Sequence, residues 1–174
     1  MDFEWPWNFN FPPFFTLQPN PETRRKQTDL WCQLIVSYCE ANKLSKVSIN
    51  SFTNSKPFVN DQIRRSCNSE LVDHILSELK KRGNLEWLDK NHQDALIKPL
   101  SASELARCIS TWAISVGQSN GVCTIFEIIH GEDTEEQKFH GLDEKIIIEA
   151  LKHLEKENKA QIMGDNEGVK FFLT

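Results

Sequence analysis

Apolar residues recur at helical spacing over a long stretch in the first half of the chain. The stretch opens with Asn20, Pro21 and Glu22, which are typical of a helix start. Asn caps the first turn, Pro suits the first helical position, and an acid suits the positive end of the helix dipole. The apolar positions that follow are Leu30, Trp31, Leu34, Ile35, Tyr38 and Cys39. Their spacing predicts one long helix that ends near Asn42.

The residues that follow predict shorter elements. We expect a short strand at residues 47–49, a short helix near residues 61–65, and a second clear helix from Ser69 to Arg82, which Gly83 ends. Two apolar runs, at residues 85–88 and 95–97, flank a polar turn. Such a pair of runs predicts a β-hairpin.

The second half of the chain repeats this pattern about 75 residues later. The apolar positions of the helix at 69–82 are matched there by Ile146, Ile147, Ala150, Leu151 and Leu154. A closing hairpin is expected at residues 159–164 and 168–173, around the turn at 165–168. Self-similarity at a fixed distance indicates a tandem duplication. Each copy reads helix, short strand, helix, helix and hairpin, which is the order of a winged helix.

The predicted fold is therefore α+β, with two tandem winged-helix domains. Each domain has three helices and a small antiparallel β-wing. We place the first domain at residues 21–99 and the second at residues 100–174. Residues 1–20, called here the N-terminal segment, precede the first helix and are expected to bind a partner.

The N-terminal segment is rich in aromatic residues and proline. It holds seven of the chain's 17 aromatic residues within its first 15 positions, and five of the seven prolines lie before residue 22. Its aromatic residues occupy odd positions from 3 to 11, which places them on one side of an extended chain, and the Pro12-Pro13 pair favours polyproline II. An apolar stripe of this kind is expected to be buried. It either folds back over the first domain or docks into a partner groove, with Phe14 and Phe15 as anchors.

Charge is distributed unevenly over the 174 residues, whose formal net charge is −5. Residues 1–99 carry 13 basic and 12 acidic side chains, and residues 100–174 carry 7 and 13, so the second half is the acidic half. Nucleic-acid binding requires Lys and Arg to neutralise phosphates, and the acidic third helix of the second domain argues against it. In the first domain, the run Lys80-Lys81-Arg82 is either a small basic patch or a solvated helix end that complements the helix dipole.

The sequence offers no catalytic motif, metal-binding pattern or cofactor signature. Five cysteines without a CxxC pair are expected to be ordinary reduced thiols. The run at residues 132–136 lacks the glycine and the bidentate glutamate of a calcium loop, so we expect a solvated loop. The chain has no apolar stretch long enough for a membrane span, and its acidic N-terminus is unlike a secretory signal. These features predict a cytoplasmic protein that is not an enzyme.

Several long motifs carry a resemblance to a known family. They are FEWPWNFNFPPFFTLQPN (residues 3–20), LKKRGNLEWLDK (79–90), GEDTEEQKFHGLDE (131–144) and GVKFF (168–172). Over nearly the whole chain, these residues resemble a subunit family of the ESCRT-II complex, the vacuolar protein sorting subunit 25 family. The resemblance implies a non-catalytic adaptor that is recruited peripherally to endosomal membranes and acts in multivesicular-body sorting of ubiquitinated cargo. Its contact with the membrane would be indirect.

The resemblance also implies partners and contact residues. Family members hold two larger winged-helix subunits, with two copies of the small subunit per complex, through a PPxY-like motif. Here that motif is Pro12, Pro13, Phe14 and Phe15, with Phe in place of the final Tyr, and we add Trp5 and Trp7 from the same segment.

The second winged helix in this family recruits the first-acting ESCRT-III subunit through a basic helix. We expect Glu132, Asp133, Glu135, Phe171 and Phe172 to make that contact. An acidic second domain suits such a partner. The alternative is a winged-helix DNA-binding transcription regulator, which rests on fold analogy alone.

Overall fold

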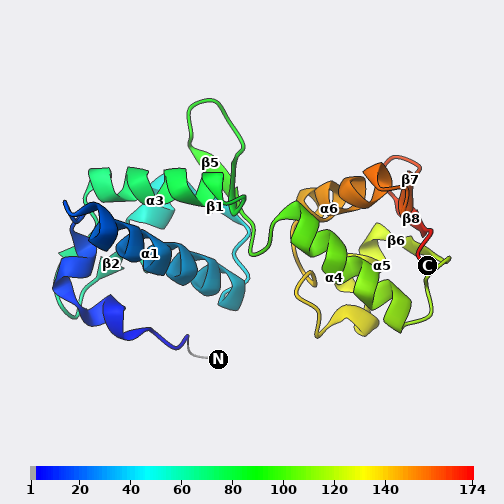
Figure 1. The fold of residues 1–174 in the computed structure, drawn as a ribbon, viewed down its shortest axis with the longest axis horizontal. Helices are drawn as coiled ribbons and strands as arrows, with labels where there is room; N and C mark the ends of the chain where they lie inside the picture. Colours follow the sequence, from blue (N-terminus) through cyan, green and yellow to red (C-terminus); the bar gives the residue numbers. More distant parts are fainter. Residues whose placement is uncertain (1–2) are drawn as a thin grey trace. The chain divides into compact units, whose positions relative to one another are not determined.

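The structure, a computed structural model, describes residues 3–174 and consists of two compact units (Figure 1). The first unit extends to Pro99, and the second comprises Leu100–Thr174.

The first unit contains three α-helices, two short 3₁₀ helices and five strands. The helices are α1 (Pro21–Ala41), α2 (Ile49–Thr53), α3 (Ser69–Lys81), η1 (Trp7–Asn10) and η2 (Pro12–Phe15). The strands are β1 (Lys46–Ser48), β2 (Val59–Asn60), β3 (Arg65–Ser66), β4 (Leu85–Trp87) and β5 (Asp94–Ile97). The antiparallel sheet has the order β1-β5-β4, with Val47 and Trp87 both opposite Ala95.

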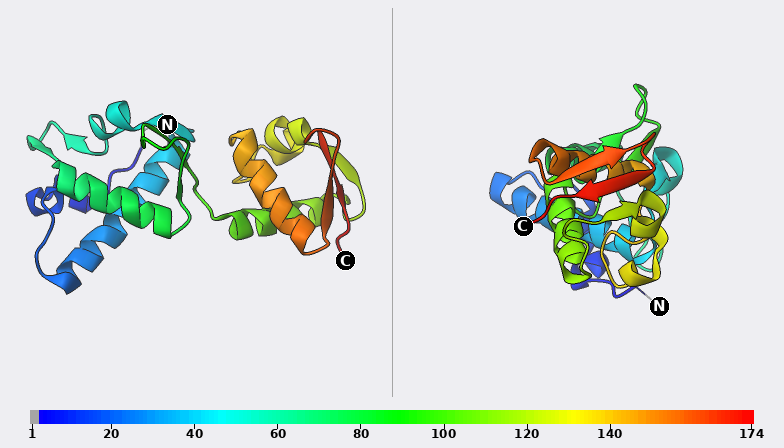
Figure 2. Two further views of the ribbon diagram at one scale, coloured as in Figure 1. Left: turned by 90° about the horizontal axis from the view of Figure 1, so that it is seen from above. Right: turned by 90° about the vertical axis from the view of Figure 1, so that its right-hand side faces the viewer.

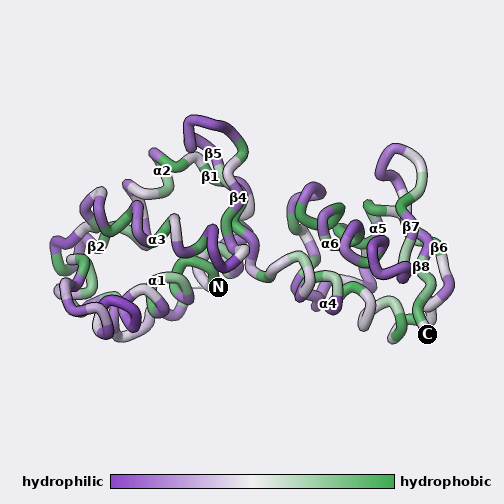
Figure 3. The backbone as a smooth tube through the Cα atoms, turned by 45° about the horizontal axis from the view of Figure 1, so that its top comes forward, coloured by the Kyte–Doolittle hydropathy of each residue, from purple (hydrophilic) through white to green (hydrophobic). Residues whose placement is uncertain are grey.

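The second unit repeats this arrangement. Its helices are α4 (Ala102–Ser115), α5 (Ile125–His130), η3 (Glu132–Thr134) and α6 (Glu144–Lys156). Its strands are β6 (Val122–Thr124), β7 (Ala160–Met163) and β8 (Gly168–Phe171), in the antiparallel order β6-β8-β7. The right-hand view of Figure 2 shows β7 and β8 side by side and antiparallel. Figure 3 shows that the turn between them and the turn between β4 and β5 are mostly hydrophilic.

The two units share one topology, so the predicted duplication is confirmed. In each, a long helix, an edge strand, a short helix and a third helix precede a hairpin whose second strand pairs with the edge strand. This is the winged-helix fold, present twice in tandem. The predicted cap of the first helix is also present, since the Asn20 side chain accepts hydrogen bonds from two backbone N–H groups of α1. At the start of α4, Ser101 and Glu104 form a capping box.

The short helix expected near residues 61–65 is wrong. Residues 61–64 form the turn of the β2–β3 hairpin and Arg65 begins β3, while the short helix is α2, which directly follows β1. Two local features favour the turn: the Asn60 side chain accepts a hydrogen bond from the backbone N–H of Gln62 at 3.1 Å, and Arg64 has a φ of 54°. A left-handed residue interrupts a right-handed helix.

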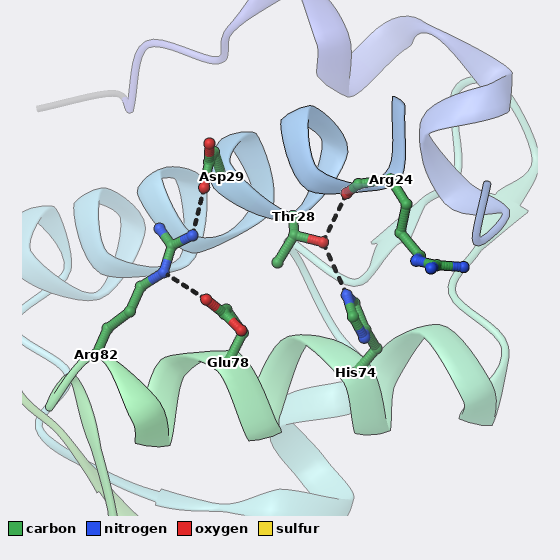
Figure 4. A network of polar contacts seen from close by, with 6 residues as sticks. All are labelled: Arg24, Thr28, Asp29, His74, Glu78 and Arg82. Atoms are coloured by element: carbon green, nitrogen blue, oxygen red, sulfur yellow. Dashed lines mark hydrogen bonds and ion pairs between the residues drawn. The ribbon is translucent and has the colours of Figure 1, made fainter. Parts of the chain in front are cut away.

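Polar contacts join α1 to α3 (Figure 4). Arg82 pairs with Asp29 on α1 and, at 3.1 Å, with Glu78 on its own helix. The Thr28 hydroxyl donates to the Arg24 carbonyl at 2.7 Å, and its oxygen also forms a hydrogen bond with Nε2 of His74 at 2.8 Å. His74 therefore has a helix-packing role.

Candidate partner-binding surfaces

The N-terminal segment folds back over the first unit. Figure 1 shows it, in dark blue, beside α1. Phe14 stacks on Trp31 of α1 with ring centroids 4.2 Å apart, and Phe15 meets the same indole edge-on at 5.4 Å. Phe14 and Phe15 retain only 4% and 2% of their accessible surface. Both rings are core residues of the first unit.

Phe14 and Phe15 were expected to anchor a partner, and here both rings are closed off from solvent against Trp31. Their contact with a partner stays a prediction. The expected extended stripe is wrong, because backbone hydrogen bonds from Phe9 to Pro6 and from Phe14 to Phe11 close 3₁₀ turns. These turns point the aromatic residues of η1 in different directions, with Phe9 buried and Trp7 exposed.

Buried polar side chains fasten the segment to the unit. The Gln27 amide donates to the carbonyls of Phe14 and Thr16 at 2.9 and 2.8 Å, and its oxygen accepts from the backbone N–H of Gln18 at 3.1 Å. Nε1 of Trp31 donates to the Phe14 carbonyl at 2.9 Å. Nδ2 of Asn60, 51 positions along the chain, donates to the Phe9 carbonyl at 2.7 Å. The segment is therefore an ordered part of the molecule.

The ordered segment leaves an apolar surface exposed. Trp7 is 71% exposed and Phe11 is 47% exposed, and their rings lie 5.7 Å apart. Together with Pro13 and Leu30 they line a groove of about 350 Å³, called here the Trp7 groove. Two large aromatic side chains exposed next to each other do not add to the stability of a monomeric protein, and such patches typically mark contact sites. Trp in particular is enriched at the centres of protein interfaces.

The other predicted residues of the segment lie around this surface. Pro12 and Pro13 are exposed. Trp5 is half-buried and stacks on Phe9 at 4.0 Å, so its ring mainly supports the segment.

A second exposed aromatic residue marks the second unit. Phe126 on α5 is 70% exposed and lines a groove of about 510 Å³, called here the Phe126 groove, beside Ile129 and His130. Its rim carries four acidic side chains from the start of α6 and the β7–β8 turn: Asp143, Glu144, Asp165 and Glu167. An apolar contact point framed by carboxylates suits a basic amphipathic segment.

The first unit has an equivalent groove with different chemistry. It is lined by Ile49, Asn50 and Thr53 of α2, and it has a volume of about 610 Å³. Asn50 follows Ile49 as Phe126 follows Ile125, so the duplicated position is polar in one unit and aromatic in the other. The apolar contact point is specific to the second unit.

The acidic run at residues 132–136 is held more tightly than a solvated loop. Residues Glu132–Thr134 form η3, Thr134 is fully buried, and Nε1 of Trp112 donates to the Asp133 carbonyl at 3.1 Å. The side chains of Glu132, Asp133 and Glu135 remain exposed.

Phe171 and Phe172 differ in accessibility. Phe171 is fully buried in the second unit, and its expected contact with a partner stays a prediction. Phe172, directly after β8, is 43% exposed.

The basic run at the end of α3 is partly neutralised. The guanidinium of Arg82 bonds to Asp29 and Glu78, and the hydrogen bond that it donates to Asp29 raises the pKa of Arg82. A side chain committed to two carboxylates is a poor phosphate ligand, which argues against a nucleic-acid surface at this position.

The described part of the chain was searched for side chains that could bind a metal ion or act as nucleophiles. Within residues 3–174 no group of three or more His, Cys, Asp or Glu side chains is placed to hold a metal ion. Burial raises the pKa of Cys32 to about 11 and of Cys39 and Cys67 to about 12, which makes them weak nucleophiles. Among the same residues, no helix combines the length and apolarity that a bilayer crossing requires.

Two features of the candidate surfaces, Gln27 and Phe126, were missed by the sequence analysis, although each left a signal. Gln27 lies on the buried face of α1 at helical spacing from Trp31 and Leu34, and a polar residue at such a position indicates a specific hydrogen-bonded role. Phe126 lies off the face of α5 that Ile125, Ile128 and Ile129 share, so it had to face solvent.

Comparisons with known proteins agree with this geometry. A family model described as "ESCRT-II complex subunit" matches residues 8–143. Proteins called vacuolar protein-sorting-associated protein 25 are 47% identical in Rattus norvegicus and 45% identical in Homo sapiens, over 99% of this chain and 99% of theirs. The protein of the same name in Drosophila melanogaster is 38% identical over 98% of this chain and 99% of its own.

Solved structures show the same fold. The crystal structure of subunit VPS25 of the endosomal trafficking complex ESCRT-II matches with a TM-score of 0.81 and 29% identity, covering 95% of this chain and 97% of that one. A subunit of the crystal structure titled endosomal complex ESCRT-II (VPS22/VPS25/VPS36) matches with a TM-score of 0.76 and 31% identity, covering 95% and 97%. With two winged helices in tandem and this likeness over its whole length, the chain belongs to the ESCRT-II complex subunit family.

Proposed function

We propose that this chain is a non-catalytic adaptor of an endosomal ESCRT-II complex, which it joins through the exposed face of its N-terminal segment. The observation that carries the proposal is the pair of solvent-exposed aromatic rings, Trp7 and Phe11, on a segment that is otherwise locked into the first unit. Rigid exposed aromatics form contact points at a low cost in conformational entropy.

The partners on this side are two larger subunits of the complex. A related structure is titled as an assembly of VPS25 with VPS22 and VPS36, which supports two such partners for this chain. The complex contains two copies of the chain, one on each larger subunit. Pro12 and Pro13 lie exposed next to Phe11 and extend the contact, while Phe14 and Phe15 support it from below.

The second unit recruits the first-acting ESCRT-III subunit. The Phe126 groove supplies an apolar contact point with an acidic rim, and the exposed Glu132, Asp133 and Glu135 follow α5 directly. These charges attract a basic helix and speed its capture. The chain thereby bridges the ESCRT-II core to ESCRT-III in multivesicular-body sorting of ubiquitinated cargo. Its recruitment from the cytoplasm to endosomal membranes is peripheral, through the other subunits.

The anchor is tested with the double variant Trp7→Ala/Phe11→Ala. Both side chains are exposed, so the variant should melt within a few degrees of the parent. Co-assembly with the two larger subunits, measured by size-exclusion chromatography with light scattering, should weaken by about 100-fold or more, because central aromatic contacts each contribute about 2 kcal/mol or more.

The matched control is Leu44→Ala, at another exposed apolar side chain of the first unit. This variant should assemble normally. Normal assembly of the Trp7→Ala/Phe11→Ala variant would refute the proposed anchor.

A further inference from the structure

One buried polar side chain on the anchoring surface lacks a partner. Asn8 is only 2% exposed, and its Nδ2 has no hydrogen-bond partner among the residues that the structure describes. The other buried amides of the first unit behave differently, since both Gln27 and Asn60 donate to backbone carbonyls. Buried polar groups are nearly always hydrogen-bonded, so the exception at Asn8 requires an explanation.

The position of Asn8 supplies that explanation. Asn8 lines the Trp7 groove together with the exposed Trp7 and Phe11. The backbone there is fixed, because the Phe11 N–H donates to the Asn8 carbonyl at 3.1 Å. A half-turn about χ2 exchanges the oxygen and nitrogen of the amide, so the direction of the donor can change without any backbone movement.

We propose that Asn8 is the specificity-determining residue of the anchoring surface. It donates from Nδ2 to a main-chain carbonyl oxygen of a larger ESCRT-II subunit, next to an apolar side chain of that subunit that fills the Trp7 groove. This inference rests on the proposed function and names the polar contact within it.

The chemistry of the groove favours a carbonyl acceptor. Half of the residues that line it are aromatic or aliphatic and half are polar, Lys26 among them, and an ionised carboxylate placed against the apolar half would lose its hydration at a high cost. A neutral peptide carbonyl loses less and gains a hydrogen bond with an amide that is otherwise unpaired. An apolar protrusion without an acceptor leaves Asn8 unsatisfied, so the same amide discriminates against unrelated hydrophobic surfaces.

The decisive variant is Asn8→Leu, which keeps the approximate size of the side chain and removes the donor. The isolated chain should melt at the same temperature or higher, because an unpaired buried amide is gone. Affinity for the purified pair of larger subunits, measured by calorimetry, should fall about tenfold or more, because the carbonyl of the partner is buried without a donor. Asn8→Asp, which is nearly isosteric and also lacks the donor, should bind at least as weakly.

A second measurement needs no variant and uses the unaltered protein. With asparagine labelled by ¹⁵N, the side-chain amide resonances of Asn8 should shift and exchange more slowly with solvent when the larger subunits are added. This measurement holds even if Asn8→Leu does not fold. Unchanged resonances, or parental affinity in Asn8→Leu, would overturn the assignment.

The double variant Trp7→Ala/Phe11→Ala separates this inference from the proposed function. If the double variant fails to assemble while Asn8→Leu assembles normally, only the role of Asn8 is wrong. If the double variant also assembles normally, the anchoring surface itself is wrong.

Discussion

Phe11 and Phe14 are three positions apart and chemically identical, yet they lie in opposite environments. Phe14 stacks on Trp31 in the core, and Phe11 is 47% exposed on the groove. Residue type alone predicted that the segment binds a partner, but it could not tell which aromatic residues are buried and which are exposed. That difference depends on η1 and η2, whose turns are set by contacts with α1 and with Asn60, far along the chain.

Replacing Phe14 by Ala should destabilise the first unit. The change removes a stacked core ring and leaves a cavity, which typically costs about 3–5 kcal/mol. Urea denaturation should report this loss, whereas Phe11→Ala should change the free energy of unfolding by less than about 1 kcal/mol. An unchanged unfolding midpoint for Phe14→Ala would contradict the burial described here.

At the scale of elements, periodic segments were predictable and short ones were not. The helices α1, α3, α4 and α6 and both hairpins follow from apolar spacing and caps, which are local signals. The turn at residues 61–64 and the 3₁₀ turns of the N-terminal segment depend on single side-chain-to-backbone hydrogen bonds, such as those of Asn60. Such bonds join residues that sequence periodicity does not connect.

The Gln27 amide is predicted to hold the N-terminal segment in its binding conformation. Gln27→Leu removes three hydrogen bonds to residues 14–18, worth about 1 kcal/mol each. Hydrogen exchange of the peptide covering residues 3–20 should accelerate, and partner affinity should fall several-fold as preorganisation is lost.

Gln161→Leu, at an exposed position of β7 in the second unit, is the matched control. It should leave exchange in the N-terminal segment unchanged. Equal exchange in the Gln27→Leu variant and the parent would show that the segment is held by its aromatic contacts alone.

The second residue of α5 is aromatic where the second residue of its duplicate α2 is polar, and this difference predicts a variant. Phe126→Asn gives the second unit the residue that the first unit has at Asn50. Because Phe126 is 70% exposed, the fold should persist. Binding of the N-terminal helix of the first-acting ESCRT-III subunit, followed by fluorescence anisotropy, should weaken about tenfold or more.

Val122→Ala serves as the control for the α5 variant, because Val122 is another exposed apolar residue of the second unit. If the Val122→Ala control loses binding and Phe126→Asn does not, the docking site does not lie on α5.

At the scale of the whole molecule, one fold used twice carries two different surfaces. The first unit has a near-neutral charge balance and presents an apolar anchor, while the second unit is acidic and presents a carboxylate-rimmed groove. The sequence alone predicted the duplication and the charge asymmetry, because both are properties of the amino-acid string. It did not predict the grooves, because a groove exists only once side chains from separate elements meet.

The most direct test of the account places a photo-crosslinking amino acid at position 7 or at position 126 of the chain within the assembled complex. Position 7 should crosslink to the larger ESCRT-II subunits, and position 126 should crosslink to the ESCRT-III subunit when it is added. A fully assembled complex in which position 7 yields no crosslink to any partner would contradict the account.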